Sequence, residues 1–407
     1  MQVDNNYGHR DVFYGRMFAL FLNAVLIVDL FRMLLGDRNS VINALQYSIY
    51  IGTTLYVIWK IIYIDHLRID KSLFSWIFAL GSTTFVSYLE CPGIKDAMGY
   101  FGAFFLTRIF PALYLSIYID NKKINTTFEC LLRYRFVWLA YAIVGGYWVP
   151  THTINSYSLT FGYNLLLPSC ITAFCCIKTF QPKWLIYTGI FGISMLLQGS
   201  RASVLCLLFF AVIAYILINK GNPKTGVVLR LMAVMFVAII VILNFKNIIN
   251  SMIALFPTSR TLRLLSNNFK FDSGRGSIRN TFYDGIKNNP LKFNGIFSDR
   301  VFYSNAIGTE FNLTNHPHSL LIELIYQFGI VGGFILIVVL LHWIVKLLFI
   351  LFKQNNHMYT FFFLFFLVAG IVKLFFSASY LMNVETFLFL GFIIAIRNYK
   401  YANTEDQ

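Results

Sequence analysis

The stretch Gly329–Phe352, GIVGGFILIVVLLHWIVKLLFILF, is apolar apart from His342 and Lys346. As a helix it is long enough to cross about 30 Å of hydrocarbon. Similar runs recur along the 407 residues, of which 57% are hydrophobic and only 13% charged. Soluble domains are about 25% charged, and the mean hydropathy here is +0.65. This composition excludes a soluble globular protein, a disordered chain and a disulfide-stapled secreted domain.

Long apolar runs predict membrane-spanning helices, whereas a β-barrel would alternate apolar and polar residues. The fold class we predict is an all-α polytopic membrane protein, with residues 1–407 as a single polytopic domain. About twelve spans are expected, at 12–35, 41–64, 73–91, 98–119, 131–149, 158–177, 184–200, 202–219, 227–247, 329–352, 359–377 and 381–396.

Charge predicts the orientation of these spans. A cytoplasmic N-terminus puts fifteen Lys and Arg residues in inner loops and leaves only Arg38, Lys95 and Arg201 in the short outer loops. Cytoplasmic loops of membrane proteins are enriched in Lys and Arg. An even number of spans then places both termini in the cytoplasm. The first run, near Met17–Leu35, is too long for a signal-peptide core, so we expect it to remain as a helix.

One connection is much longer than the others and lies on the outer side, from about 248 to 328. Long loops without structure of their own are usually functional or disordered, and the apolar and aromatic residues in this one argue for order. We expect a helix from about Arg275 to a stop before Pro290, and a second from Ser319 to Phe328. Gly329 would mark the turn into the next span.

Polar residues suited to a phosphate-linked substrate gather on this outer face. Arg201 begins a span at the outer boundary, and Arg275 and Arg279 lie four residues apart on one helix face. His316 and His318 precede the helix that re-enters the membrane. Arginines bind phosphate oxygens through planar paired donors, and a histidine can accept a proton near neutral pH.

Three local patterns resemble the O-antigen polymerase/O-antigen ligase superfamily. Leu197–Ala202 (LQGSRA) is similar to its Ser-Arg or Thr-Arg element at the outer end of a span. Gly274-Arg275, followed by Pro290-Leu291, is similar to its Gly-Arg…Pro-Leu element. His318-Ser319-Leu320-Leu321 with Gly329 and Gly332 resembles its His-Asn-x-x-Leu…Gly-x-x-Gly element, with Ser319 where Asn is usual.

The resemblance implies a glycosyltransferase of the GT-C type in the cell inner membrane, with a periplasmic active site partly on the 248–328 loop. By this resemblance, Arg201 and Arg275 hold the diphosphate of an undecaprenyl-diphosphate-linked oligosaccharide, and His318 accepts the proton of an acceptor sugar hydroxyl. The outer face carries no D-x-D or comparable acidic cluster. The expected reaction therefore uses no metal and no cofactor.

Further residues are expected at the substrate site with alternative roles. Arg279 could bind substrate or be a surface charge, and either His316 or His318 could be the base. Glu323 could orient a histidine or an arginine, or form a local ion pair. Arg108, within a span, could line a substrate cavity or pair with a buried acid such as Glu90 or Glu385.

Three functions remain open at this point. The favoured one is a polymerase that joins lipid-linked repeat units, with the same lipid-linked glycan as donor and acceptor. An O-antigen ligase would instead transfer the glycan to lipid A-core. A lipid-linked oligosaccharide flippase is the third, although transporters commonly show repeat symmetry and a site near the midplane. The polymerase resemblance also implies a chain-length regulator as partner. Nucleic acid is not an expected partner, because the basic residues fit the positive-inside pattern.

Overall fold

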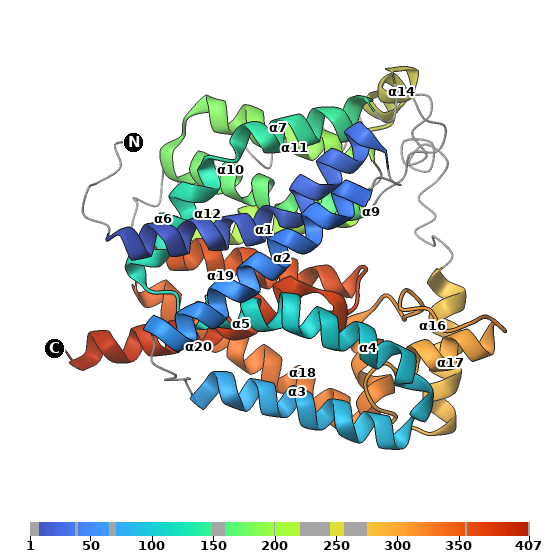
Figure 1. Cartoon of the computed structure of the whole chain (residues 1–407). Coiled ribbons are helices and arrows are strands. Elements are labelled where there is room, and N and C mark those ends of the chain that lie inside the picture. Colours follow the sequence, from blue (N-terminus) through green and yellow to red (C-terminus); the bar gives the residue numbers. More distant parts are fainter. Residues whose placement is uncertain are drawn as a thin grey trace. The chain divides into compact units, whose positions relative to one another are not determined.

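The structure is a computed structural model that describes residues 8–36, 40–64, 71–148, 159–198, 200–219, 245–255, 275–354 and 356–405. Every regular element in these ranges is a helix (Figure 1). The chain divides into two compact units. The first comprises Met1–Tyr47, Asn125–Phe271 and Asn355–Ala369, and the second Ser48–Ile124, Asp272–Gln354 and Gly370–Gln407.

Aromatic side chains pack between the helices of the first unit. Its helices are α1 (His9–Leu35), α6 (Asn121–Leu132), α7 (Arg135–Ile143), the π-type turn η4 (Val144–Trp148), α9 (Leu159–Asn164), α10 (Leu166–Thr179), α11 (Pro182–Leu197), α12 (Arg201–Ile218), α14 (Phe245–Leu255) and α19 (His357–Gly370). Phe361 packs against Phe128 and Phe174, with ring centroids 5.2 and 5.0 Å away. Trp138 donates to Asn23 (2.6 Å), which satisfies both buried groups.

The second unit carries most of the predicted outer loop. Its elements are α2 (Ser40–Trp59, shared with the first unit), η1 (Lys60–Ile64), α3 (Lys71–Glu90), η2 (Pro92–Ile94), α4 (Lys95–Phe104), η3 (Phe105–Ile109), α5 (Phe110–Ile117), α16 (Arg275–Asn288), α17 (Ser298–Ala306), α18 (Leu320–Gln354), η5 (Val372–Phe375), η6 (Tyr380–Met382) and α20 (Val384–Glu405). Helices α20 and α5 pack closely at Gly391, where an added Cβ would lie 2.0 Å from Oγ of Ser116.

Eight helices among the described residues are long and apolar enough to cross a membrane: His9–Leu35, Ser40–Ile64, Lys71–Glu90, Ala97–Ile117, Thr160–Thr179, Arg201–Ile218, Leu320–Lys353 and His357–Phe375. This confirms an all-helical polytopic membrane protein. The exact number of spans stays a prediction. The expected span at 184–200 corresponds to the shorter helix Pro182–Leu197, and most of 227–247 lies outside the described residues.

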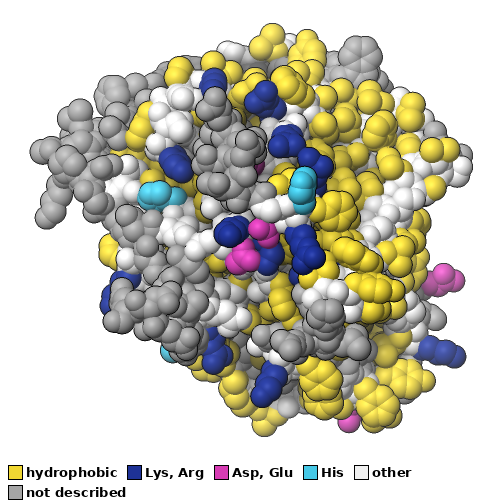
Figure 2. All heavy atoms as spheres, turned by 60° about the vertical axis from the view of Figure 1, so that its left-hand side comes forward, with side chains coloured by type: hydrophobic (Ala, Val, Ile, Leu, Met, Phe, Trp, Pro, Cys, Tyr) yellow, Lys and Arg dark blue, Asp and Glu magenta, His cyan; other side chains and the backbone are white. Residues whose placement is uncertain are grey.

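Large apolar side chains on these helices point away from the protein. Phe78 of α3 is 66% exposed, and Phe334 and Val345 of α18 are 63% and 65% exposed. On the face drawn in Figure 2, hydrophobic side chains form broad patches, while Lys and Arg side chains gather near its middle. Contiguous apolar surface of this extent would be costly in water, and it is what a helix facing lipid needs.

The predicted loop helices are present at the expected positions. Helix α16 begins at Arg275 and ends at Asn288, before Pro290, and α18 begins at Leu320. A break at Gly329, with φ +73° and ψ 167°, divides α18 into a short first part and a long apolar part. Between α16 and α18 lies the short helix α17, which the sequence pattern did not predict.

The segment that follows α16 stabilises the break in α18. The backbone N–H groups of Asn294 and Gly295 donate to the carbonyl of Gln327 (both 3.0 Å), and Ile330 N–H donates to Pro290 O (2.8 Å). These bonds satisfy backbone groups that the break removes from the helical ladder. The Pro290-Leu291 element and the Gly329 turn therefore form one structural unit.

Candidate active site

The site residues of the second unit come from α16 and from the turn before α18. Arg275 and Arg279 are both half-buried on α16. A nitrogen of Arg275 donates to the carbonyl of Phe376, just after η5, which fixes the guanidinium against that segment. Both arginines act electrostatically on His318. This effect indicates that both arginines lie near His318, and their roles at a substrate site stay predictions.

His316 and His318 lie together in a constrained turn. Their ring centroids are 4.1 Å apart, and the N–H of His318 donates to Nδ1 of His316 (3.2 Å). Because that Nδ1 is an acceptor, a neutral His316 carries its proton on Nε2. His318 has φ +52°, a left-handed conformation that residues other than glycine and asparagine rarely adopt. Strained backbone of this kind is common at functional sites.

Burial and nearby positive charge keep both histidines neutral. Burial, followed by the charges of Arg275, Arg279 and Arg300, lowers the pKa of His318 to about 4. Burial, followed by His318 and the arginines, lowers the pKa of His316 to about 2. At neutral pH both imidazoles are therefore unprotonated. Nδ1 of His318 is buried with no hydrogen-bond partner among the described residues, as is Nε of Arg279.

A buried ionic cluster adjoins this turn, and most of it was missed from the sequence. The guanidinium of Arg300 on α17 contacts Asp299 (2.6 Å) and Glu323 of α18 (2.9 Å). All three side chains are fully buried. Ser379 accepts from Arg300 and donates to Glu323. Of the alternatives for Glu323, the structure shows the ion pair with an arginine.

The polar cluster continues to η6. Gln327 donates to Asp299 (2.8 Å) and accepts from the hydroxyl of Tyr380 (2.6 Å). The two carboxylates outweigh the effect of burial and raise the pKa of Arg300, so it stays charged. Besides Glu323, the sequence signal for this cluster was the charged Asp299-Arg300 pair within a partly apolar loop.

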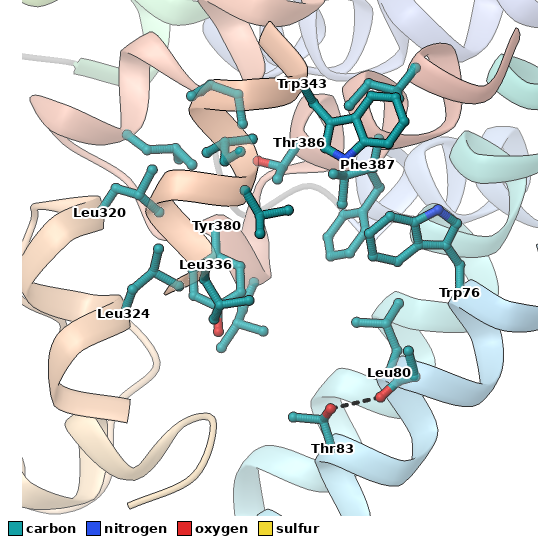
Figure 3. A pocket seen from close by; sticks show the side chains of 18 of the residues that line it. Trp76, Leu80, Thr83, Leu320, Leu324, Leu336, Trp343, Tyr380, Thr386 and Phe387 are labelled. Carbon is teal, nitrogen blue, oxygen red and sulfur yellow. Dashed lines mark hydrogen bonds between the residues drawn. The ribbon is translucent and has the colours of Figure 1, made fainter. Parts of the chain in front are cut away.

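An apolar cavity of about 480 Å³ begins beside the cluster (Figure 3). The Leu320 and Leu324 side chains of α18 and the Tyr380 ring of η6 line it, as do Trp343 of α18 and Trp76 of α3. Leu320 is two residues beyond His318 in the chain, and Leu324 is next to Glu323. The second unit therefore combines a histidine turn near two arginines of α16 with an apolar cavity that runs along the membrane part of α18.

Two predicted residues lie elsewhere. Arg201 begins α12 in the first unit, so its approach to Arg275 and His318 stays a prediction. Arg108 lies in the π-type turn of η3, stacked on Tyr50 (4.4 Å) and Phe104 (5.1 Å). A role for Arg108 at a substrate cavity stays a prediction. In the described part of the chain, Arg108 does not line the apolar cavity, and Glu385 pairs with Lys373 instead (3.8 Å).

Within the described residues, no three His, Cys, Asp or Glu side chains come together as a metal-binding group. The metal requirement of the reaction stays a prediction. The basic character of the site comes from arginines on two loop helices, and the base candidates are the two neutral histidines.

These features define a polytopic helical membrane protein with a cationic histidine site next to an apolar cavity. Residues 186–337 match the Wzy_C family, which is described as O-antigen ligase. All three motifs lie within this range, so the match confirms the family resemblance over these residues. No curated protein and no solved structure matches the chain.

Proposed function

We propose that this membrane protein is a glycan polymerase that joins oligosaccharide units carried on undecaprenyl diphosphate. The family implies a membrane enzyme that transfers lipid-linked glycans in surface polysaccharide synthesis. The observation that carries the proposal is the neutral His318 beside Arg275 and Arg279. This arrangement pairs a proton acceptor with cationic donors for a diphosphate.

The proposed reaction transfers a glycan between two lipid-linked molecules. His318 removes the proton from a hydroxyl of the acceptor sugar while that oxygen attacks the anomeric carbon of the donor. The bond between this carbon and the diphosphate oxygen breaks, and undecaprenyl diphosphate leaves with the electron pair. Arg275, Arg279 and Arg201 stabilise the negative charge that grows on the leaving group.

The apolar cavity supports a lipid-linked donor. A polyprenyl tail needs apolar surroundings next to the place where its diphosphate binds, and the cavity lining includes Leu320 and Tyr380 beside the charged cluster. The long lipid would continue from the cavity into the bilayer. A water-soluble sugar nucleotide would have no use for such a cavity.

A ligase is the second candidate, because the matched family is described as O-antigen ligase. Both reactions use the same donor site and differ in the acceptor. Purified protein in lipid nanodiscs, supplied with a single lipid-linked repeat unit, separates them. A ladder of longer glycans supports the polymerase. Product that forms only when lipid A-core is added supports the ligase instead.

The same assay tests the proposed residues. We expect Arg275→Ala, Arg201→Ala and His318→Ala to abolish the ladder, whereas Lys287→Ala should leave it unchanged. Lys287 is a matched control, because it is a cation on the same helix as Arg275 with its side chain 78% exposed. Movement of labelled lipid across vesicles without a new glycosidic bond would indicate a flippase and refute the proposal.

A further inference from the structure

Because the Arg300 side chain is fully buried, it is not available to bind a substrate. Its guanidinium is 0% exposed and contacts Asp299 and Glu323 directly. Buried ion pairs are poor sources of net stability, because removing both charges from water costs about as much as their attraction returns. They do favour a single geometry, since breaking one partner leaves a buried charge unpaired.

The geometry that Arg300 favours is that of the His316–His318 turn. Helix α17 contacts both sides of this turn from one buried face. Before the turn, Asn315 donates to Ser304 (3.0 Å), and after it, Glu323 in the first turn of α18 pairs with Arg300. Arg300 and Ser304 are four residues apart on α17, and both are buried.

The turn between these two contacts is strained and requires such support. His318 has a positive φ, and a strained residue of this kind persists only when the surrounding structure holds it in place. Pro317 and the bond from the His318 N–H to His316 restrict the turn locally. The contacts with α17 fix its two ends relative to the rest of the unit.

We propose that Arg300 is a positioning residue. Together with Ser304 and through α17, it holds the strained His316–His318 turn, and with it the His318 imidazole, in its working geometry. This inference rests on the proposed function of His318 as the base. The charged and titratable groups that act on His318 are Arg275 and Arg279 from α16, Arg300 from α17 and His316 from the turn. Asp299 and Glu323 pair with Arg300.

The test compares Arg300→Gln with Arg300→Lys in the full chain, in nanodiscs. The readout is the reaction of His318 with diethyl pyrocarbonate between pH 5 and pH 8, measured by peptide mass spectrometry, with the exposed His9 as internal reference. In the wild type we expect a flat profile. In Arg300→Gln the reaction should fall toward pH 5, since losing a nearby cation raises the protonation midpoint by roughly one pH unit. Arg300→Lys should restore the flat profile.

Turnover gives a second readout. Arg300→Gln should lower kcat by about tenfold or more with little change in the KM for donor, because a displaced base slows the chemical step. Should Arg300→Gln not fold, Ser304→Ala removes the other contact with α17 and should lower kcat at unchanged KM. A folded Arg300→Gln with wild-type labelling and kcat overturns the inference, as does an unchanged kcat in Ser304→Ala.

The labelling experiment needs no glycan transfer, so it separates two failures. A wild-type protein that labels as expected but makes no glycosidic bond refutes the proposed function. An active wild type whose His318 responds to neither Arg300→Gln nor Ser304→Ala refutes the positioning role alone.

Discussion

At the scale of single residues, the most informative pair is His316 and His318. Both are neutral, but their environments differ: His316 is 8% exposed and its Nδ1 accepts the N–H of His318, whereas Nδ1 of His318 has no partner among the described residues. This asymmetry favours His318 as the proton acceptor and His316 as its support.

Replacing each histidine separates these roles. His318→Ala should lower the transfer rate by about 10²–10⁴-fold, the range for loss of a general base. His316→Ala should cost about tenfold or less, because it removes one hydrogen bond worth about 1 kcal/mol. Rates of ladder formation measure both, with His342→Ala as a control on the apolar part of α18. Equal losses in the two variants would contradict the assignment.

The lowered pKa of His318 predicts an unusual pH profile. Because its pKa is about 4 rather than 6.5, the base of the free enzyme stays neutral from pH 7 down to about pH 5. The acid limb of kcat/KM should therefore lie near pH 4. A bound diphosphate offsets the positive field of Arg275, so the acid limb of kcat should lie at higher pH. A limb of kcat/KM near pH 6.5 would contradict this.

The same histidine links pH to stability, and the sign follows from proton uptake. Between about pH 4 and pH 6.5 the unfolded chain binds a proton at this position and the folded chain does not. The contribution of the neutral imidazole to the free energy of unfolding is therefore fully present above about pH 6.5 and is lost as the pH falls toward about 4.

At the scale of elements, the break in α18 lies between the His316–His318 turn and the long apolar part of the helix. Gly329 has φ +73°, and a Cβ there would lie 2.9 Å from the carbonyl oxygen of Leu291. Gly333, four residues later, approaches the backbone of Ile325, where a Cβ would be 2.8 Å away. These glycines let the two parts of α18 and the Pro290-Leu291 segment pack closely.

A series of Gly→Ala variants tests this account of the break. Gly329→Ala adds both a strained φ and a backbone clash, so it should destabilise the protein by about 1–3 kcal/mol or more. Gly308→Ala has φ +66° but open space around it, and Gly192→Ala on α11 has neither problem. Thermal unfolding in detergent should rank the losses as Gly329, then Gly308, then Gly192. Gly329→Ala as stable as Gly192→Ala would contradict the account.

The cavity beside α18 gives a prediction about the donor lipid. Leu336→Trp fills part of the cavity, while Val345→Trp adds the same bulk to the exposed side of the same helix. We expect Leu336→Trp to raise the KM for a long-chain polyprenyl donor about tenfold and to have less effect on a donor with a short chain. Val345→Trp should leave both values near wild type. Equal effects of Leu336→Trp on the two donors would contradict lipid binding there.

At the scale of the whole molecule, the sequence predicted what local signals encode. Apolar runs predicted the helical membrane fold, and Pro290 and Gly329 marked the end of α16 and the break in α18. Arg275 and His318 were proposed because short motifs carry them, and Arg279 and His316 because they lie within four residues of these two. Arg300 was not found, because its partners Glu323 and Ser379 are 23 and 79 residues away in the chain, and no local pattern encodes such contacts.

Orientation in the membrane is the remaining prediction on which the periplasmic site depends. It follows from the excess of Lys and Arg in one set of loops, which predicts that α16 faces outward and the α10–α11 connection faces inward. The test uses intact cells that produce the protein without its native cysteines. A membrane-impermeant maleimide should label Lys287→Cys in these cells and should not label Lys183→Cys until the cells are opened. Both positions are exposed, so accessibility to the reagent is matched. Labelling of Lys183→Cys alone in intact cells would place His318 and Arg275 on the cytoplasmic side, where lipid-linked glycans presented outside could not reach them.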